Sequence, residues 1–325
     1  MQKYTVRKYL PTDAAQWNEF LLTAKNATFL FNRNYMEYHS DRFEDYSLMV
    51  FDKNKLIAIL PANKEADVIY SHKGLTYGGI VYGSDIKLSG VILVLRDILK
   101  FLSDSGFKLL NIKLIPSIYW DTLADETAYA LFVCGASLYR RDNLSVIDRQ
   151  KPFKFSKDRI KCARRGERNK LQIREEPEFE AFWKKILIPN MNRKHGVKPV
   201  HTIEEITKLH QRFPENIRHF NVYHNDKIIA GTTIFLSKNV AHPQNISANE
   251  LKNETGSLDY LYSHLIHDVF RDIKYFDFGP STEQNGTKMN SGLLFWKESF
   301  GARTATQDFY TVETANYNLL ENMML

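Results

Sequence analysis

A weak internal repeat restricts the folds open to this chain of 325 residues more than any other feature. Near its start, "YTVRKY" alternates as a strand does, and "TDAAQWNEFLL" follows with apolar residues at helical spacing. Far along the chain the same order returns in "KLQIREE" and "PEFEAFWKKIL". The sequence therefore predicts one structural unit that is built twice.

Each copy continues with a β-hairpin and then a helix. In "YSLMVFD-KN-KLIAILPA" and in "RHFNVYH-ND-KIIAGTTIFL", two strand patterns flank a tight turn that contains Asn. A helix with one apolar face follows each hairpin, at residues 89–102 and 257–270, and each helix leads into another strand. Matched positions lie 166 to 172 residues apart, as Lys108 and Lys274 or Leu56 and Ile228 do. This nearly constant offset favours a duplication over two unrelated α/β stretches.

The order of the elements predicts an α/β fold whose sheets mix antiparallel and parallel pairing (α+β in that sense). The hairpins require antiparallel neighbours, while the strand–helix–strand step requires a right-handed parallel crossover. We therefore expect two mixed sheets with helices on both faces. The charged, Pro-containing stretch 148–158 is the expected boundary, which gives domains at residues 1–150 and 151–325.

Composition restricts the function and location of the protein less than the repeat restricts its fold. The formal net charge of +6 and the pI of about 9.0 slightly favour an anionic ligand, such as a phosphate-bearing cofactor or RNA. Cys134 and Cys162 form no metal or redox spacing, which makes a reducing compartment, the cytoplasm, the expected location. No apolar run approaches the roughly 20 residues of a membrane span. His195, His201 and His210 lack the spacing of metal ligands, so no metal is predicted.

Two segments of the second copy are candidates for a site. Thr255, Gly256 and Ser257 stand where the crossover helix begins, and its unpaired N–H groups suit an anion. The alternative is an ordinary turn. In "YFDFG", Asp277 lies either in a cleft or in a buried hydrogen bond. The polar loop after this strand leads to a helix that carries Lys297, for which spacing alone favours a solvent-exposed position.

Two further segments have open interpretations. "SHKGLTYGGIVYG", residues 71–83, holds His72, Tyr77 and Gly78, and its glycines allow the backbone to approach a ligand closely. A glycine-rich strand and turn is the alternative. The basic run at residues 157–170 indicates either contact with phosphates or RNA or, more commonly, a solvated helix face.

These segments together resemble the tandem GNAT-like fold of the FemAB-type acyltransferases, and more narrowly the bacterial FemAB-like and GNAT-like proteins of unassigned substrate. The resemblance runs from about residue 29 to 302. It is carried by "FLFNRNYMEYHSDRFEDYSLMVFD", "LPAN", "SHKGLTYGGIV", "HGVKPVHTIEEITKLHQRFPENI", "KIIAGTTIF", "GSLDYL", "YFDFGPSTEQNG" and "LLFWKESFGA".

The resemblance implies a place for each substrate. GNAT-like units separate two adjacent strands, hold the pantetheine arm of the acyl donor between them, and bind its pyrophosphate at the crossover helix, here at Thr255, Gly256 and Ser257. FemAB enzymes instead take an aminoacyl group from tRNA and transfer it to an amine of a cell-wall precursor. Their aromatic–Lys pair near the transfer site matches Trp296-Lys297, so Lys297 is expected to face the oxyanion or a donor phosphate. The resemblance implies an acceptor pocket that is lined by Tyr77, Gly78, Ser281, Asn290 and Trp296.

The chain also departs from both groups. It lacks the long helical arm of FemAB proteins and the Q/R-x-x-G-x-G/A loop of ordinary GNAT enzymes. We expect an N-acyltransferase that uses acyl-CoA, or less favourably aminoacyl-tRNA, with a small-molecule or cell-envelope amine as acceptor. Asp277 or His72 is the expected base, acting through water. The alternatives are a non-catalytic binding protein with degenerate GNAT domains and an aminoacyl-tRNA-dependent ligase. The acyl group, the acceptor and the oligomeric state are not specified by the sequence.

Overall fold

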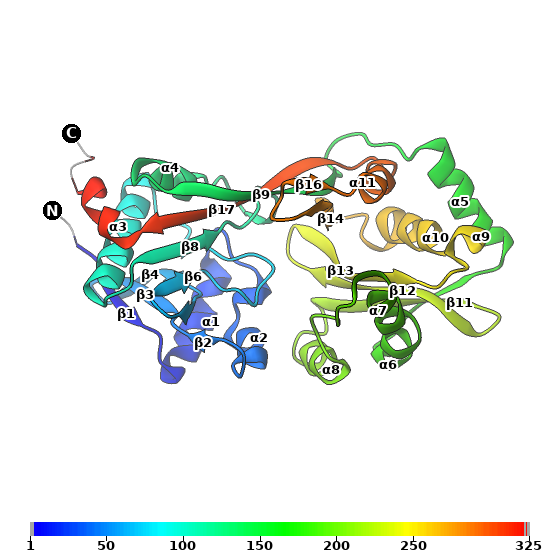
Figure 1. Cartoon of the computed structure of the whole chain (residues 1–325), viewed down its shortest axis with the longest axis horizontal. Coiled ribbons are helices and arrows are strands. Elements are labelled where there is room, and N and C mark those ends of the chain that lie inside the picture. The colour runs from blue at the N-terminus through cyan, green and yellow to red at the C-terminus, as the bar shows by residue number, and fades with distance from the viewer. Residues whose placement is uncertain (1–2, 322, 324–325) are drawn as a thin grey trace. The chain divides into compact units, whose positions relative to one another are not determined.

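A computed structural model describes residues 3–321 and 323 and contains two compact units (Figure 1). The first unit extends to Asp142 and includes Gln284–Thr287 and the residues from Thr306 onward, while the second holds Asn143–Glu283 and Lys288–Ala305. The C-terminal strand returns to the first unit because it pairs antiparallel with a strand there, Phe309 opposite Lys113. The two units are therefore not separated by one boundary at residue 150, because the chain returns from the second unit to the first.

The first unit has two sheets, in the orders β1-β3-β4-β7 and β9-β17-β8-β6-β5-β2. The apolar face predicted for the helix after the first hairpin is buried against them, as Val91, Leu95 and Leu102 show. The unit's elements are β1 (Thr5–Lys8), α1 (Ala14–Thr23), α2 (Arg33–Met36), β2 (Glu44–Asp45), β3 (Leu48–Asp52), β4 (Lys55–Leu60), β5 (Asn63–Glu65), β6 (Val68–Tyr70), β7 (Val81–Tyr82), α3 (Leu88–Asp104), β8 (Leu109–Lys113), α4 (Glu126–Val133), the start of β9 (Ser137–Asp148) and most of β17 (Arg303–Glu313).

The second unit has one sheet of order β10-β11-β12-β13-β14, to which β9 adds on the β14 side. Helices α6, α7 and α8 cover one face of this sheet and α10 covers the other (Figure 1). A π-helical turn joins α6 to α7, and another ends α10. The unit's elements are α5 (Lys157–Arg168), β10 (Gln172–Glu175), α6 (Phe179–Phe182), α7 (Ile188–His195), α8 (Ile203–Arg212), β11 (Ile217–His224), β12 (Lys227–Leu236), β13 (Val240–Ala248), α9 (Lys252–Thr255), α10 (Ser257–His264), β14 (Tyr275–Pro280), β15 (Thr282–Glu283), β16 (Lys288–Met289) and α11 (Ser291–Glu298).

The structure confirms the predicted α/β class and the repeated order of elements. Both hairpins form, β3 with β4 and β11 with β12, and both crossover helices follow them. The polar loop predicted at residues 281–291 contains a small hairpin of β15 and β16. Its turn has positive φ at Gln284, Asn285 and Gly286, the backbone geometry that an Asn-Gly pair favours. Within the described residues, every helix is too short or too polar to cross a bilayer.

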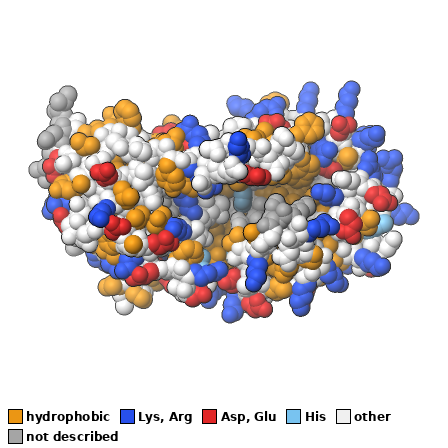
Figure 2. All heavy atoms as spheres, viewed as in Figure 1, with side chains coloured by type: hydrophobic (Ala, Val, Ile, Leu, Met, Phe, Trp, Pro, Cys, Tyr) orange, Lys and Arg blue, Asp and Glu red, His pale blue; other side chains and the backbone are white. Residues whose placement is uncertain are grey.

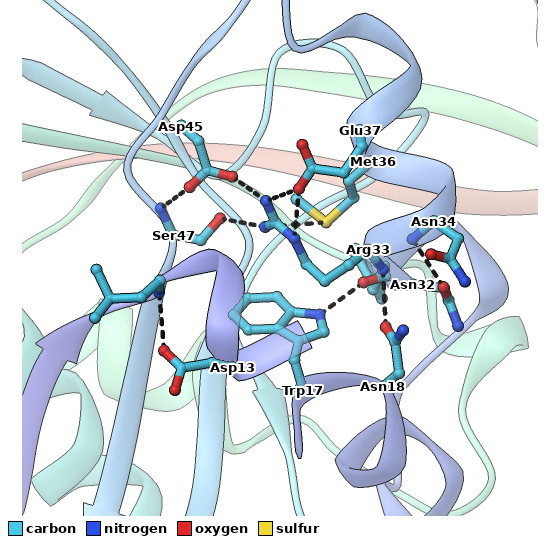
Figure 3. A network of polar contacts seen from close by, with 12 residues as sticks. Asp13, Trp17, Asn18, Asn32, Arg33, Asn34, Met36, Glu37, Asp45 and Ser47 are labelled. Carbon is cyan, nitrogen blue, oxygen red and sulfur yellow. Dashed lines mark hydrogen bonds and ion pairs between the residues drawn. The ribbon is translucent and has the colours of Figure 1, made fainter. Parts of the chain in front are cut away.

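A buried arginine fixes the start of α2 in the first unit (Figure 3). The Arg33 side chain is 3% exposed and donates to Glu37, to Asp45 at 2.5 Å and to the Ser47 hydroxyl at 3.2 Å. Its guanidinium also lies 3.8 Å from the centre of the Tyr9 ring. One cation thus joins α2 to the segment that enters β3, and it is stabilised by charge and by an aromatic face.

We predict that Arg33→Ala lowers the free energy of unfolding by about 2 kcal/mol, because it leaves two carboxylates unpaired and opens a cavity. The loss stays below the full cost of breaking a buried pair because Glu37 and Asp45 are partly exposed. Urea unfolding followed by tryptophan fluorescence measures it. Lys55→Ala removes an ion pair between two exposed side chains and should change stability by less than about 0.5 kcal/mol. Equal losses in the two variants would contradict the role assigned to Arg33.

Candidate functional site

The candidate site begins where two parallel strands separate. Among the described residues, β13 and β14 pair at two positions only, Val240 with Tyr275 and Ala241 with Phe276. Beyond these, β13 stays paired with β12, and β14 stays paired with β9. Each strand thus continues in the sheet through its outer neighbour, while the ladder between β13 and β14 ends after Ala241 and Phe276. The sheet therefore has a fork in the second unit.

A histidine and an aspartate meet at this fork. Nδ1 of His242 lies 3.0 Å from the backbone oxygen of Asp277 and 3.2 Å from its Oδ2. The other carboxylate oxygen, Oδ1, accepts the Gly279 N–H at 2.7 Å. Asp277 is 2% exposed, whereas the His242 side chain is 12% exposed. Asp277 is thus buried and hydrogen-bonded, and it also borders the fork.

Lys297 points inward at the end of β14. Its Nζ donates to the carbonyl of Gly279 at 2.9 Å and to that of Pro280 at 2.7 Å, and the residue is 2% exposed. The solvent-exposed position that spacing favoured is wrong, because the residue is buried and its ammonium group donates to two backbone carbonyls at the end of β14. Burial lowers the pKa of Lys297 to about 8, and nearby Asp277 partly offsets this effect.

Gly279 allows these groups to come together. Its φ is +72°, and a Cβ at this position would lie 3.0 Å from Cε1 of His242. The ladder between β14 and β9 is irregular between Asp277 and Pro280, which turns the two carbonyls toward Lys297. A residue without a side chain is needed here both for the left-handed backbone and for the approach of the histidine ring.

The neighbouring helix α11 is anchored at two points. Asn290 caps it, since its side-chain oxygen accepts the Leu293 N–H at 3.1 Å. Trp296 donates its Nε1–H to Oδ1 of Asp259 at 3.0 Å, and Arg159 of α5 contacts the same oxygen. The predicted substrate contacts Asn290 and Trp296 therefore hold Lys297 in place through the helix.

The start of α10, predicted to bind the donor, is buried beneath α5. Thr255, Gly256 and Ser257 are all buried. A Cβ on Gly256 would lie 2.3 Å from the backbone oxygen of Cys162 in α5. The Thr255 hydroxyl donates to Leu251 O at 2.9 Å. Gly256 thus allows α5 and α10 to approach closely, and α5 occupies the space in front of the N-terminus of α10.

The predicted residues of the first unit form a separate group. His72 is buried, its ring stacks on His39 at 5.0 Å between centroids, and burial holds its pKa well below the usual range. The Tyr77 hydroxyl donates to Thr28 Oγ1 at 3.0 Å. A Cβ on Gly78 would lie 1.6 Å from the backbone oxygen of Ser71. These residues are fixed by contacts within their own unit, whereas Asp277, Ser281, Asn290 and Lys297 belong to the second.

Sequence reasoning missed His242. His242 lies on β13 at the position that follows the last parallel pair with β14. Only the long-range register of two strands reveals its partner, so the sequence gives no local sign. Within the part of the chain that the structure describes, no three His, Cys, Asp or Glu side chains gather as metal ligands, and the side chain of His195 lies outside that part.

The model of the GNAT acetyltransferase domain family matches residues 155–287, which span the fork. This part of the second unit is therefore similar to a GNAT acetyltransferase domain. None of the curated protein sequences matches the chain.

Solved structures extend the likeness to the whole chain. The crystal structure of FemX has a TM-score of 0.65 at 9% identity, covering 94% of this chain and 96% of FemX. L-PGS from Bacillus licheniformis has a TM-score of 0.57 at 12% identity, covering 97% and 96%. The C-terminal domain of a proposed lysylphosphatidylglycerol synthetase from Agrobacterium fabrum has a TM-score of 0.55 at 12% identity, covering 81% and 84%. At these identities they show a shared fold, in agreement with the FemAB-like, GNAT-like resemblance of the sequence.

We predict that Gly279→Ala costs about 2 kcal/mol of stability, from left-handed backbone strain and the contact with His242 together. Gly106→Ala is the matched control, because its φ is +85° and nothing lies within 4 Å of an added Cβ. That variant should lose only the backbone part, about 1 kcal/mol. Thermal unfolding of both variants measures the difference. Equal losses would show that the histidine ring does not crowd Gly279.

Proposed function

We propose that the GNAT domain of the second unit transfers an acyl group from an activated donor to an amine acceptor, and that the reaction takes place at the fork of β13 and β14. One observation supports this most strongly. The parallel pair opens after two positions, and the buried cation of Lys297 lies at the end of β14 beside the opening. A strand gap exposes backbone groups that a thin extended donor can use, and a nearby cation suits a developing negative charge.

Lys297 supplies that charge. An ammonium group has three N–H donors, and the carbonyls of Gly279 and Pro280 accept two of them. The third remains for the carbonyl oxygen of the donor, whose negative charge grows as the amine attacks. Because the group is buried, its interaction with that charge is screened less than it would be in water.

For the donor, the start of α10 favours an aminoacyl ester carried on RNA over acyl-CoA. A pyrophosphate needs the N–H groups of a helix N-terminus, and α5 covers that end of α10. The same helix presents exposed cations at Lys157, Lys161, Arg164 and Arg168, a spacing that places them along one face. Figure 2 shows lysine and arginine side chains gathered over the part of the second unit where Figure 1 places α5. A row of about 16 Å suits the backbone of a nucleic acid.

We predict transfer of label to a lysine-containing peptide from total tRNA charged with ¹⁴C-labelled amino acids, and little from ¹⁴C-acetyl-CoA. The double variant Lys161→Glu/Arg164→Glu should weaken tRNA binding and lower the slope of log Kd against log salt by about one per lost phosphate contact. Lys208→Glu, an exposed lysine on α8 of the same unit, is the control and should change neither.

Other outcomes identify the other functions. Transfer from acetyl-CoA alone would support the acyl-CoA donor expected from the sequence. If no donor is consumed and neither free CoA nor tRNA raises the melting temperature, acyl transfer is excluded and the binding protein with degenerate GNAT domains is favoured.

We predict that Lys297→Ala lowers kcat by more than tenfold, and that wild-type kcat declines as the pH rises through about 8, where Lys297 loses its charge. The pKa in the folded state lies below that of the unfolded chain. The wild type therefore gains stability relative to Lys297→Met as the pH rises from about 8 toward the ordinary lysine pKa. Steady-state kinetics and urea unfolding across this range test both signs. Full activity in Lys297→Ala would remove the residue from the mechanism.

A further inference from the structure

We propose that His242 is the general base of the transfer, with Asp277 as the residue that positions it. The inference rests on the function proposed above. It replaces the bases expected from the sequence, Asp277 or His72 acting through water, with a histidine that the sequence did not mark. Asp277 keeps a role, but it acts through the imidazole.

The hydrogen bonds of His242 fix which nitrogen is free to act. Both atoms facing Nδ1, the backbone oxygen of Asp277 and its Oδ2, accept hydrogen bonds. Nδ1 must therefore carry the hydrogen, which leaves the lone pair of the neutral ring on Nε2. In the described chain Nε2 has no hydrogen-bond partner, and it is absent from the polar atoms that are both buried and unpaired. The basic nitrogen thus reaches solvent at the fork.

Asp277 holds the ring in one orientation. Its carboxylate is fixed by the Gly279 N–H on Oδ1, so Oδ2 and the backbone oxygen present a rigid pair of acceptors to Nδ1. The close approach of Gly279 to Cε1 limits rotation of the ring further. A buried carboxylate that holds one imidazole nitrogen while the other faces a reactant is the arrangement that activates a histidine base.

Two other histidines in the described part of the chain lack this combination. His219 is buried and both its nitrogens are engaged, Nδ1 with Thr233 Oγ1 and Nε2 with Asn221 Oδ1, each at 3.0 Å. His264 also contacts an aspartate, Asp268 at 2.9 Å, but both side chains are exposed on the helical surface. His264 therefore gives a matched control, a His–Asp pair away from the fork.

The proposed transfer forms an amide bond and breaks the ester bond of the donor. The amine nitrogen forms a bond to the carbonyl carbon of the donor ester, and the carbonyl electron pair moves to the oxygen that Lys297 faces. Nε2 of His242 takes the proton that the amine nitrogen loses. When the carbonyl re-forms, the bond from carbon to the leaving oxygen breaks, and that oxygen receives the proton from Nε2. The products are an amide and a free hydroxyl, and the histidine returns to its neutral form.

The test uses two acceptors that differ in their need for a base. Both amines lose one proton as the amide forms, but a lysine side chain is an ammonium at neutral pH and must lose a further proton before it can attack, whereas hydroxylamine is largely unprotonated. With charged total tRNA as donor, His242→Ala should lower the rate with the peptide by about a hundredfold or more, and the enzyme-dependent rate with hydroxylamine by less than about tenfold. Added imidazole should restore part of the peptide activity by entering the space that the ring leaves. Asp277→Asn should show the same preference for hydroxylamine, and His264→Ala should match the wild type with both acceptors.

The outcomes separate this inference from the proposed function. Equal losses with both acceptors, or no rescue by imidazole, would overturn the assignment of His242 while leaving acyl transfer in place. Transfer to neither acceptor by the wild type would defeat the proposed function itself. If His242→Ala does not fold, as judged by its thermal unfolding, His242→Gln keeps most of the volume without a basic nitrogen and is compared between the same two acceptors.

Discussion

The separation of β13 from β14 is the constraint on which the rest of the site depends. Two parallel strands that part after two paired positions leave backbone groups without ladder partners, and buried groups of this kind need other partners. At the end of β14, Lys297 donates to the carbonyls of Gly279 and Pro280, and the Asp277 carboxylate accepts the N–H of Gly279. Charged side chains thus bind backbone groups beside the fork, and the proposed acyl transfer uses the same side chains.

The second constraint is the contact between α5 and α10. Gly166 and Gly256 both lie where an added Cβ would collide with the facing helix, at Tyr260 and at Cys162, so the helices approach closely. This approach removes the start of α10 from solvent and turns the basic face of α5 outward. This covered helix N-terminus is the reason why the proposed donor carries its phosphates along a surface and does not place a pyrophosphate at the start of α10.

Local patterns in the sequence were sufficient for the fold and insufficient for the site. Turns containing Asn set both long hairpins, and apolar faces set α3 and α10, because these signals act over a few residues. The turn of β15 and β16 carried the same signal at Asn285 and Gly286, yet the polar composition around it suggested a loop. The inward orientation of the Lys297 side chain and the contact of His242 with Asp277 depend on the register of strands across the sheet. The spacing of residues along the sequence does not predict that register. The burial of Gly256 likewise depends on a helix that starts a hundred residues earlier, at Lys157.

The two copies differ at the positions that the proposed mechanism uses. Asp277 is the third residue of β14, and the third residue of the corresponding strand β8 is Asn111, an amide without charge. Lys297 is the seventh residue of α11, and the seventh residue of α4 is Phe132, which is exposed. The gap between the end of β8 and the segment before β7 is reduced to a cavity of about 30 Å³, bordered by Gly79, Ile80 and Leu114, and the Gly78 N–H bridges it to Lys113 O at 3.2 Å. The first copy thus keeps the architecture, while the acid, the cation and the histidine of the open fork occur together in the second.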